Sequence, residues 1–109
     1  MVLLDESDAD ALWVFTQSGR TARHVSKRRP AKPVYAFSPH ESTIRYLSGL
    51  WGIQPVLIPE VQTTEQMIAA GDRVVRERRL MRPGRGVIVL AGQAPTVGAT
   101  DLIKIHRIP

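Results

Sequence analysis

The sequence predicts an α/β fold, a three-layer α/β/α sandwich around a five-stranded mixed sheet. Continuously apolar runs at 11–16, 33–37 and 86–91 are typical of strands that are buried on both faces of a sheet. Segments with helical spacing of apolar residues separate the first four strands, and this alternation implies parallel pairing through right-handed crossovers. We expect a single such domain over residues 1–109.

Two helices are expected in the first half of the chain. The basic stretch 20–29 has apolar residues at helical spacing. The second helix should begin after the strand at 33–37, because Ser38 can cap it, Pro39 suits its first position and Glu41 can complete a capping box. This second helix should run to about Ser48.

The third strand and the third helix follow. The run 53–58 has strand character, and because Pro55 cannot donate to a ladder, this strand belongs on an edge of the sheet. Thr63 and Gln66 have capping-box spacing and predict the start of the third helix.

The end of the chain predicts a hairpin. The strand at 86–91 and the last strand at 102–108 are joined by 92–100 without a helix, so this pair should be antiparallel. With the third and fifth strands on the two edges, the expected sheet order is 3-2-1-4-5. Three residues of the last strand indicate a solvated edge: Lys104, His106 and Arg107.

Composition narrows the class of protein and of partner. The chain has 109 residues, no cysteine and a formal net charge of +5. Disulfides and thiolate metal sites are excluded, and a cytoplasmic location is expected. No apolar run approaches the roughly 20 residues that a membrane helix needs, and the acidic start of the chain does not resemble a signal peptide. The charge favours an anionic partner.

The expected strand order also predicts a ligand site. The chain leaves the first strand on one side and returns on the other, and ligands of open α/β sheets bind beyond the carboxyl ends of strands at such a switch point. The loops 16–21 and 92–100 should meet there, and the first opens a helix, whose free N–H groups and dipole favour phosphate. The candidate phosphate-binding residues are Thr16, Gln17, Ser18, Gly19, Arg20, Thr21, Gly92, Gln93, Thr96, Gly98 and Thr100.

A purely structural interpretation of these loops stays open. Ser18 could serve only to cap its helix. The glycines of 92–100 could serve only the geometry of the turn.

Three segments resemble the C-terminal domain of pyruvate kinases. They are TQSGRTARHVSKRRP at 16–30, VYAFSPHESTIRYLSGLWGIQPVLIP at 34–59 and GRGVIVLAGQAPTVGATDLIKIHRI at 84–108. The resemblance runs from about Ala11 to Ile108. It implies the same 3-2-1-4-5 sheet, a domain that performs no chemistry, and a two-loop site for sugar phosphates such as fructose 1,6-bisphosphate. It further implies a homodimer through the last strand, or a pyruvate kinase-like partner that carries the catalytic barrel.

Carried over by position, the resemblance implies that one phosphate is held by Thr16, Ser18, Gly19, Arg20 and Thr21, with 92–100 covering the sugar. This sequence departs from the family in several places. Gln17 stands where some effector-activated members have lysine, and 63–66 lacks a tryptophan. The arginine for a second phosphate is missing unless Arg82 or Arg85 replaces it. The expected ligand is therefore phosphate, sulfate or a monophosphorylated metabolite.

A nucleic-acid-binding module is the alternative from another class. The basic run near the end of the third helix comprises Arg73, Arg76, Arg78 and Arg79. Such a stripe can neutralise phosphates, but no aromatic residues interleave with it and no base-recognition motif is present. A solvated helix face is the favoured interpretation. Trp13 and Trp51 are expected in core or helix-end packing.

No catalytic, metal or cofactor site is predicted. His24, His40 and His106 are scattered over different predicted elements, whereas metal ligands must converge, so solvated or capping roles are expected. No serine has an acid and a base placed to activate it. The sequence therefore predicts a binding or structural module, not an enzyme.

Overall fold

Strands and helices alternate along the chain as far as residue 91. A computed structural model describes residues 9–91 and 102–109. In chain order the elements are β1 (Ala11–Phe15), α2 (Arg20–Lys27), β2 (Val34–Ser38), α3 (Glu41–Leu47), β3 (Ile53–Leu57), α4 (Thr64–Glu77), β4 (Gly86–Ala91) and β5 (Leu102–Arg107). In these two segments, no helix combines the length and the apolar content needed to cross a membrane.

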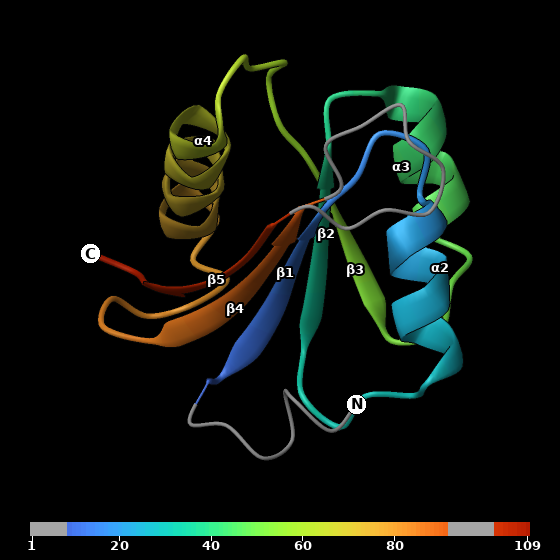
Figure 1. Cartoon of the computed structure of the whole chain (residues 1–109), viewed down its shortest axis with the longest axis horizontal. Coiled ribbons are helices and arrows are strands. Elements are labelled where there is room, and N and C mark those ends of the chain that lie inside the picture. Colours follow the sequence, from blue (N-terminus) through green and yellow to red (C-terminus); the bar gives the residue numbers. More distant parts are fainter. Residues whose placement is uncertain (1–8, 92–101) are drawn as a thin grey trace.

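The strands form one sheet of order β3-β2-β1-β4-β5 (Figure 1). β1 pairs in parallel with β2 and with β4, and β2 pairs in parallel with β3. β5 runs antiparallel to β4. The strand order and the orientation of β5 that the sequence predicts are confirmed.

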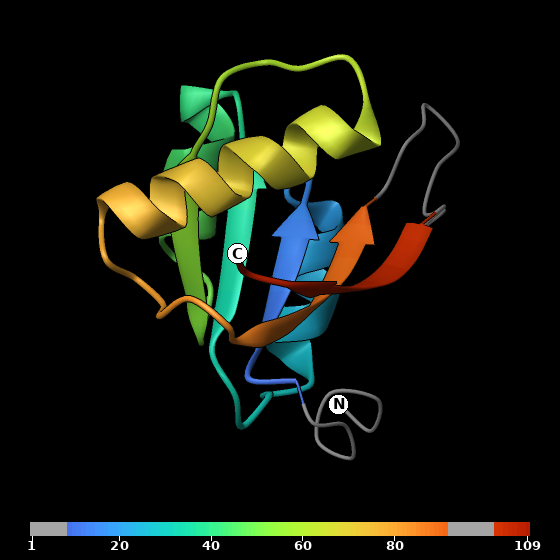
Figure 2. The same ribbon diagram turned by 90° about the vertical axis from the view of Figure 1, so that its left-hand side faces the viewer.

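Helices cover both faces of the sheet, as predicted. α4 lies on one face, and α2 and α3 lie on the other (Figures 1 and 2). The core is accordingly divided into two halves. On the α4 side it contains Trp13 and Phe37, and on the α2/α3 side it contains Leu12 and Val14. Because consecutive residues of β1 face different helix layers, all of them are buried and the strand shows no alternation.

The edge position of β3 and the start of α4 are confirmed as well. β3 contains Pro55 and pairs only on its β2 side in the sheet order. At the N-terminus of α4, the Gln66 N–H donates to Thr63 Oγ1 at 3.1 Å and the Thr63 N–H donates to Gln66 Oε1 at 3.3 Å. The predicted capping box is therefore present.

The predicted cap of α3 is wrong. Ser38 is the buried last residue of β2, where its carbonyl accepts a hydrogen bond from the Ile58 N–H at 3.0 Å. Its hydroxyl accepts from the His40 N–H at 3.2 Å, and the helix begins only at Glu41, with His40 as N-cap. Pairing with β3 holds Ser38 in the sheet, which delays the start of the helix.

The predicted solvated role of His106 is also wrong. Its Nε2 donates to the two carboxylate oxygens of Asp72 at 2.9 and 3.0 Å, and the side chains are only 18% and 10% exposed. The imidazole also lies against Trp13, with ring centroids 5.8 Å apart. This contact ties the edge strand β5 to α4. Arg107, the next residue, is exposed as predicted.

We expect the Asp72–His106 contact to stabilise the fold. Either residue changed to alanine leaves the partner's polar group inadequately paired in a partly buried site, so each variant should lose about 1–3 kcal/mol of unfolding free energy. Urea denaturation of both single variants and of the double variant measures their coupling. A coupling energy below about 0.5 kcal/mol would show that the contact contributes little.

Candidate anion site

The connection from β1 to α2 contains the first half of the predicted site, residues 16–21. β1 and β4 are parallel neighbours, and Phe15 at the end of β1 is the register partner of Ala91 at the end of β4. The chain therefore enters 16–21 and leaves β4 from adjacent positions, at the carboxyl ends of these two strands (Figure 2, blue and orange arrows). α2 and α4 cover opposite faces, so the carboxyl ends of β1 and β4 form the predicted switch point.

The first six candidate residues lie in the connection after β1 and in the first turn of α2: Thr16, Gln17, Ser18, Gly19, Arg20 and Thr21. The other five lie outside the described residues: Gly92, Gln93, Thr96, Gly98 and Thr100.

Two hydroxyl groups fix the shape of the loop. The buried Thr16 accepts a hydrogen bond at its Oγ1 from the Gly19 N–H at 2.9 Å. Ser18 Oγ accepts from the Arg20 N–H at 3.3 Å. These bonds engage the amide of the N-cap residue and that of the first helical residue. The structural interpretation of Ser18 thus has support, because its hydroxyl binds the start of α2.

Two structural features favour glycine at position 19. Its φ of 92° lies in the left-handed region, where residues with a Cβ are strained. A Cβ at this position would also lie 2.7 Å from Cδ2 of Tyr46 on α3. Glycine therefore lets the loop pass close to α3.

We expect Gly19→Ala to destabilise the protein more than Gly84→Ala does. Gly84 has a similar φ of 89°, but nothing lies within 4 Å of a Cβ placed on it. Both substitutions introduce backbone strain of about 1–2 kcal/mol, and only the first adds a clash with Tyr46. Equal losses of unfolding free energy in urea denaturation would show that Tyr46 does not restrict the loop.

α3 holds the loop from a second side. Thr43 Oγ1 donates to the Gln17 carbonyl at 2.6 Å, and His40 Nε2 donates to Gln17 Oε1 at 2.6 Å. These two residues of the loop's environment were not predicted from the sequence. They lie 26 and 23 positions from Gln17, and no local pattern marks them.

Arg20 is the exposed first residue of α2. Among the described parts of the chain it takes part in no ion pair. The exposed cations Arg23, Lys27, Arg28 and Arg29 follow along the same helix and its C-terminal end. The first turn contains no acidic residue. The field around the loop is accordingly positive.

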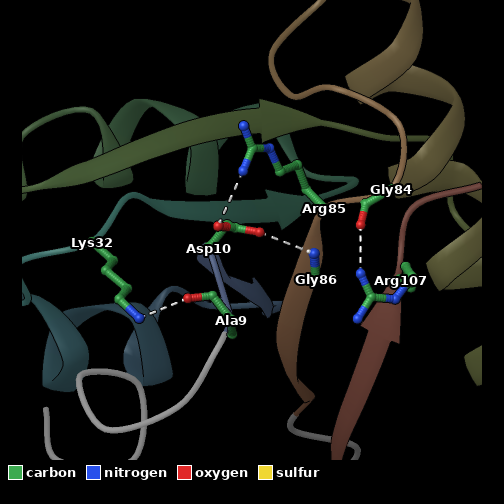
Figure 3. Close-up of polar contacts among 7 residues, drawn as sticks. All are labelled: Ala9, Asp10, Lys32, Gly84, Arg85, Gly86 and Arg107. Atoms are coloured by element: carbon green, nitrogen blue, oxygen red, sulfur yellow. Dashed lines mark hydrogen bonds and ion pairs between the residues drawn. The ribbon is translucent and has the colours of Figure 1, made fainter.

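The arginines suggested for a second phosphate lie at the wrong end of the sheet. Arg85 directly precedes β4, and β4 is parallel to β1. Arg85 therefore lies at the amino ends of these strands, opposite the residues that follow β1. There its Nη1 lies 3.6 Å from Asp10 Oδ1 (Figure 3). The turn also contains Arg82, whose carbonyl accepts from the Arg85 N–H at 3.4 Å. Arg85, and with it the turn that contains Arg82, thus lies away from residues 16–21.

The amino ends of β1 and β4 have a structural role. The Gly86 N–H donates to Asp10 Oδ2 at 3.2 Å, and Lys32 Nζ donates to the Ala9 carbonyl at 2.7 Å. Arg107 Nη1 donates to the Gly84 carbonyl at 2.6 Å, so these contacts connect the starts of β1, β2 and β4 with the end of β5 (Figure 3).

A hollow opens beside the candidate loop on the α4 side. Its volume is about 350 Å³ counted out to open solvent. Its walls come from the ends of β1 and β2, the segment after β3 and the first turn of α4. The lining residues are Phe15, Thr16, Gln17, Phe37, Pro39, Ile58, Pro59, Val61 and Met67.

The remaining predicted features are solvated or structural. The arginines at the end of α4 are all exposed: Arg73, Arg76, Arg78 and Arg79. Trp13 is fully buried in the core, whereas Trp51, just beyond α3, is half exposed, with Arg29 stacked 4.8 Å from its ring centroid. Among the described residues, no group of three or more potential ligands could hold a metal ion.

Comparison with known proteins decides the family. The family model described as "Pyruvate kinase, alpha/beta domain" matches residues 1–106. The chain belongs to this family. It is a pyruvate kinase C-terminal domain, in agreement with the sheet order and with the resemblance of its three segments.

Three relatives illustrate the extent of the match. The chain is 40% identical over 102 residues to pyruvate kinase 2 of Synechocystis, a match that covers 93% of the chain and 17% of that protein. It is 37% identical to pyruvate kinase of Mycobacterium tuberculosis and 35% identical to that of Clostridium acetobutylicum, each over 93% of the chain and 22% of the relative. The chain thus spans about a fifth of the length of these relatives.

Proposed function

We propose that this domain is a non-catalytic regulatory module that binds phosphate, sulfate or a monophosphorylated metabolite at the connection from β1 to α2. The observation that supports it most is the pairing of Phe15 with Ala91, which starts 16–21 and 92–100 from adjacent positions at the switch point of the sheet. Because 92–100 follows β4 directly beside the end of β1, we include it in the proposed site.

The chemistry of the loop suits an oxyanion. The N-terminus of α2 has a partial positive charge from its dipole. Arg20 is exposed there and can supply two parallel hydrogen bonds to a phosphate. Gln17 stands where some members of the family have lysine, and Arg85 lies at the other end of the strands, beside Asp10. Both features favour a ligand with one phosphate over a bisphosphate.

The proposed absence of catalysis rests on the extent of the match. The chain corresponds to the α/β domain alone, about a fifth of the pyruvate kinases that it resembles. We propose a cytoplasmic protein in which this domain transmits ligand binding to a partner, either a second copy or a pyruvate kinase-like barrel subunit.

The edge strand β5 is the proposed surface for a second copy. Ile105 lies opposite the buried Ile88, yet it is 78% exposed. An edge strand has unpaired backbone groups on its outer side, and an exposed aliphatic residue beside them favours strand pairing across a two-fold axis.

We expect phosphate to raise the melting temperature. Binding to the native state at ten times Kd should shift Tm by about 5 °C for a domain of this size. The double variant Ser18→Ala/Arg20→Ala should lose the shift, because it removes a hydroxyl and the exposed guanidinium of the loop. Arg28→Ala is the matched control, since it removes one exposed cation from the other end of α2 and should keep the shift. A wild-type protein that shows no shift with millimolar phosphate, sulfate or phosphorylated metabolites would refute the binding proposal.

We expect Ile105→Arg to abolish self-association, because it places a charge beside the pairing edge. Leu57→Arg is the matched control: it changes a 46% exposed aliphatic residue on the other edge strand, β3. Sedimentation velocity should show a dimer for the wild type and the control and a monomer for Ile105→Arg. A monomeric wild type at all concentrations would contradict the proposed interface.

A further inference from the structure

Apart from Thr16 and Gln17, the residues that line the hollow beside the candidate loop are not among those proposed to hold a phosphate. We propose that it receives the rest of the ligand, and that this ligand is a phosphomonoester of a compact apolar group. This inference rests on the proposed function and names the class of ligand for the same site.

The hollow and the loop are continuous. Thr16 and Gln17 line the hollow, and they are also the first two residues of the connection that leads into α2. A phosphate at the start of α2 would therefore have its ester group directed along Thr16 and Gln17 toward the hollow. One molecule with a charged end and an uncharged end can occupy both.

The lining selects for apolar groups. Seven of the nine lining residues are apolar, and only Thr16 and Gln17 are polar. Of these two, Thr16 Oγ1 is engaged by the Gly19 N–H and Gln17 Oε1 by His40 Nε2. A sugar placed here would find only the remaining donors of Thr16 and Gln17, so most of its hydroxyl groups would lose water without replacement, which is costly.

The accessible part of the wall is aliphatic. Phe15 and Phe37 stack with centroids 4.8 Å apart but lie behind the surface, since they are only 3% and 0% exposed. Contact with a ligand therefore falls to the more exposed lining residues Pro39, Pro59, Val61 and Met67. At the mouth, Val61 and Met67 are partly exposed, and the unbranched methionine can adapt to the shape of a ligand.

The lining also disfavours a second phosphate. None of the described residues that line the hollow is a cation. Arg85 lies at the amino ends of β1 and β4, where it pairs with Asp10 at 3.6 Å. A second phosphate would enter an apolar environment without a counter-charge, so a monoester with an uncharged body is the ligand that fits.

Isothermal titration calorimetry with four probes tests this inference on the full chain. The probes are inorganic phosphate, phenyl phosphate, glucose 6-phosphate and phenol. Burial of one ring should make phenyl phosphate bind about tenfold or more tightly than inorganic phosphate and glucose 6-phosphate. Phenol should bind more weakly than phenyl phosphate, because it lacks the anion.

Two variants locate the ring. Met67→Gln places a polar amide at the mouth and should weaken phenyl phosphate binding by about tenfold while inorganic phosphate binding is unchanged. Val61→Ser should act in the same direction, so the test does not depend on the folding of one variant. Met81→Gln is the matched control, because Met81 packs against the same half of the core but does not line the hollow.

The outcomes separate the two proposals. Binding of inorganic phosphate, with phenyl phosphate no tighter or with glucose 6-phosphate preferred, would overturn the inference and leave the proposed function intact. An advantage of phenyl phosphate that survives both Met67→Gln and Val61→Ser would also overturn it. If inorganic phosphate does not bind and phenyl phosphate binds no better than phenol, both proposals fail.

Discussion

The burial of β1 between two strands and two helix layers is the constraint on which the rest of the structure depends. β1 pairs with β2 on one side and β4 on the other, and every one of its residues is buried. A strand in this position cannot shift its register without moving Trp13 and Val14 into the wrong halves of the core. The ends of β1 are therefore placed firmly, and the connection that follows Phe15 begins at a defined point.

This rigidity extends into the candidate site. Thr16 and Ser18 bind the backbone of their own loop, while Thr43 of α3 and the N-cap residue His40 bind Gln17. A loop that is already ordered loses little conformational entropy when a ligand binds. The same contacts mean that changes at Thr16 or Gly19 alter stability as well as binding, so only exposed residues such as Arg20 test recognition alone.

The two sides of the site differ in chemistry because they belong to different layers. The α2 side has the helix N-terminus and a series of exposed cations. The α4 side has the apolar hollow, with the buried rings of Phe15 and Phe37 behind its wall. The proposed ligand, with its anion on the first side and its apolar group on the second, matches this division. Met67, and not a cation, lines the apolar side.

The sequence by itself determined those features that a few contiguous residues encode. Apolar runs predicted the buried strands, Pro55 the sheet edge, and Thr63 with Gln66 the capping box, because each depends on local backbone preference. Tertiary structure alone decided the pairing of Asp72 with His106, the hold of His40 on Gln17 and the remote place of Arg85. These contacts join distant positions, and the packing of helices on the sheet determines which side chains meet. Ser38 shows the competition between the two: its cap preference is local, but pairing with β3 is stronger and keeps it in the strand.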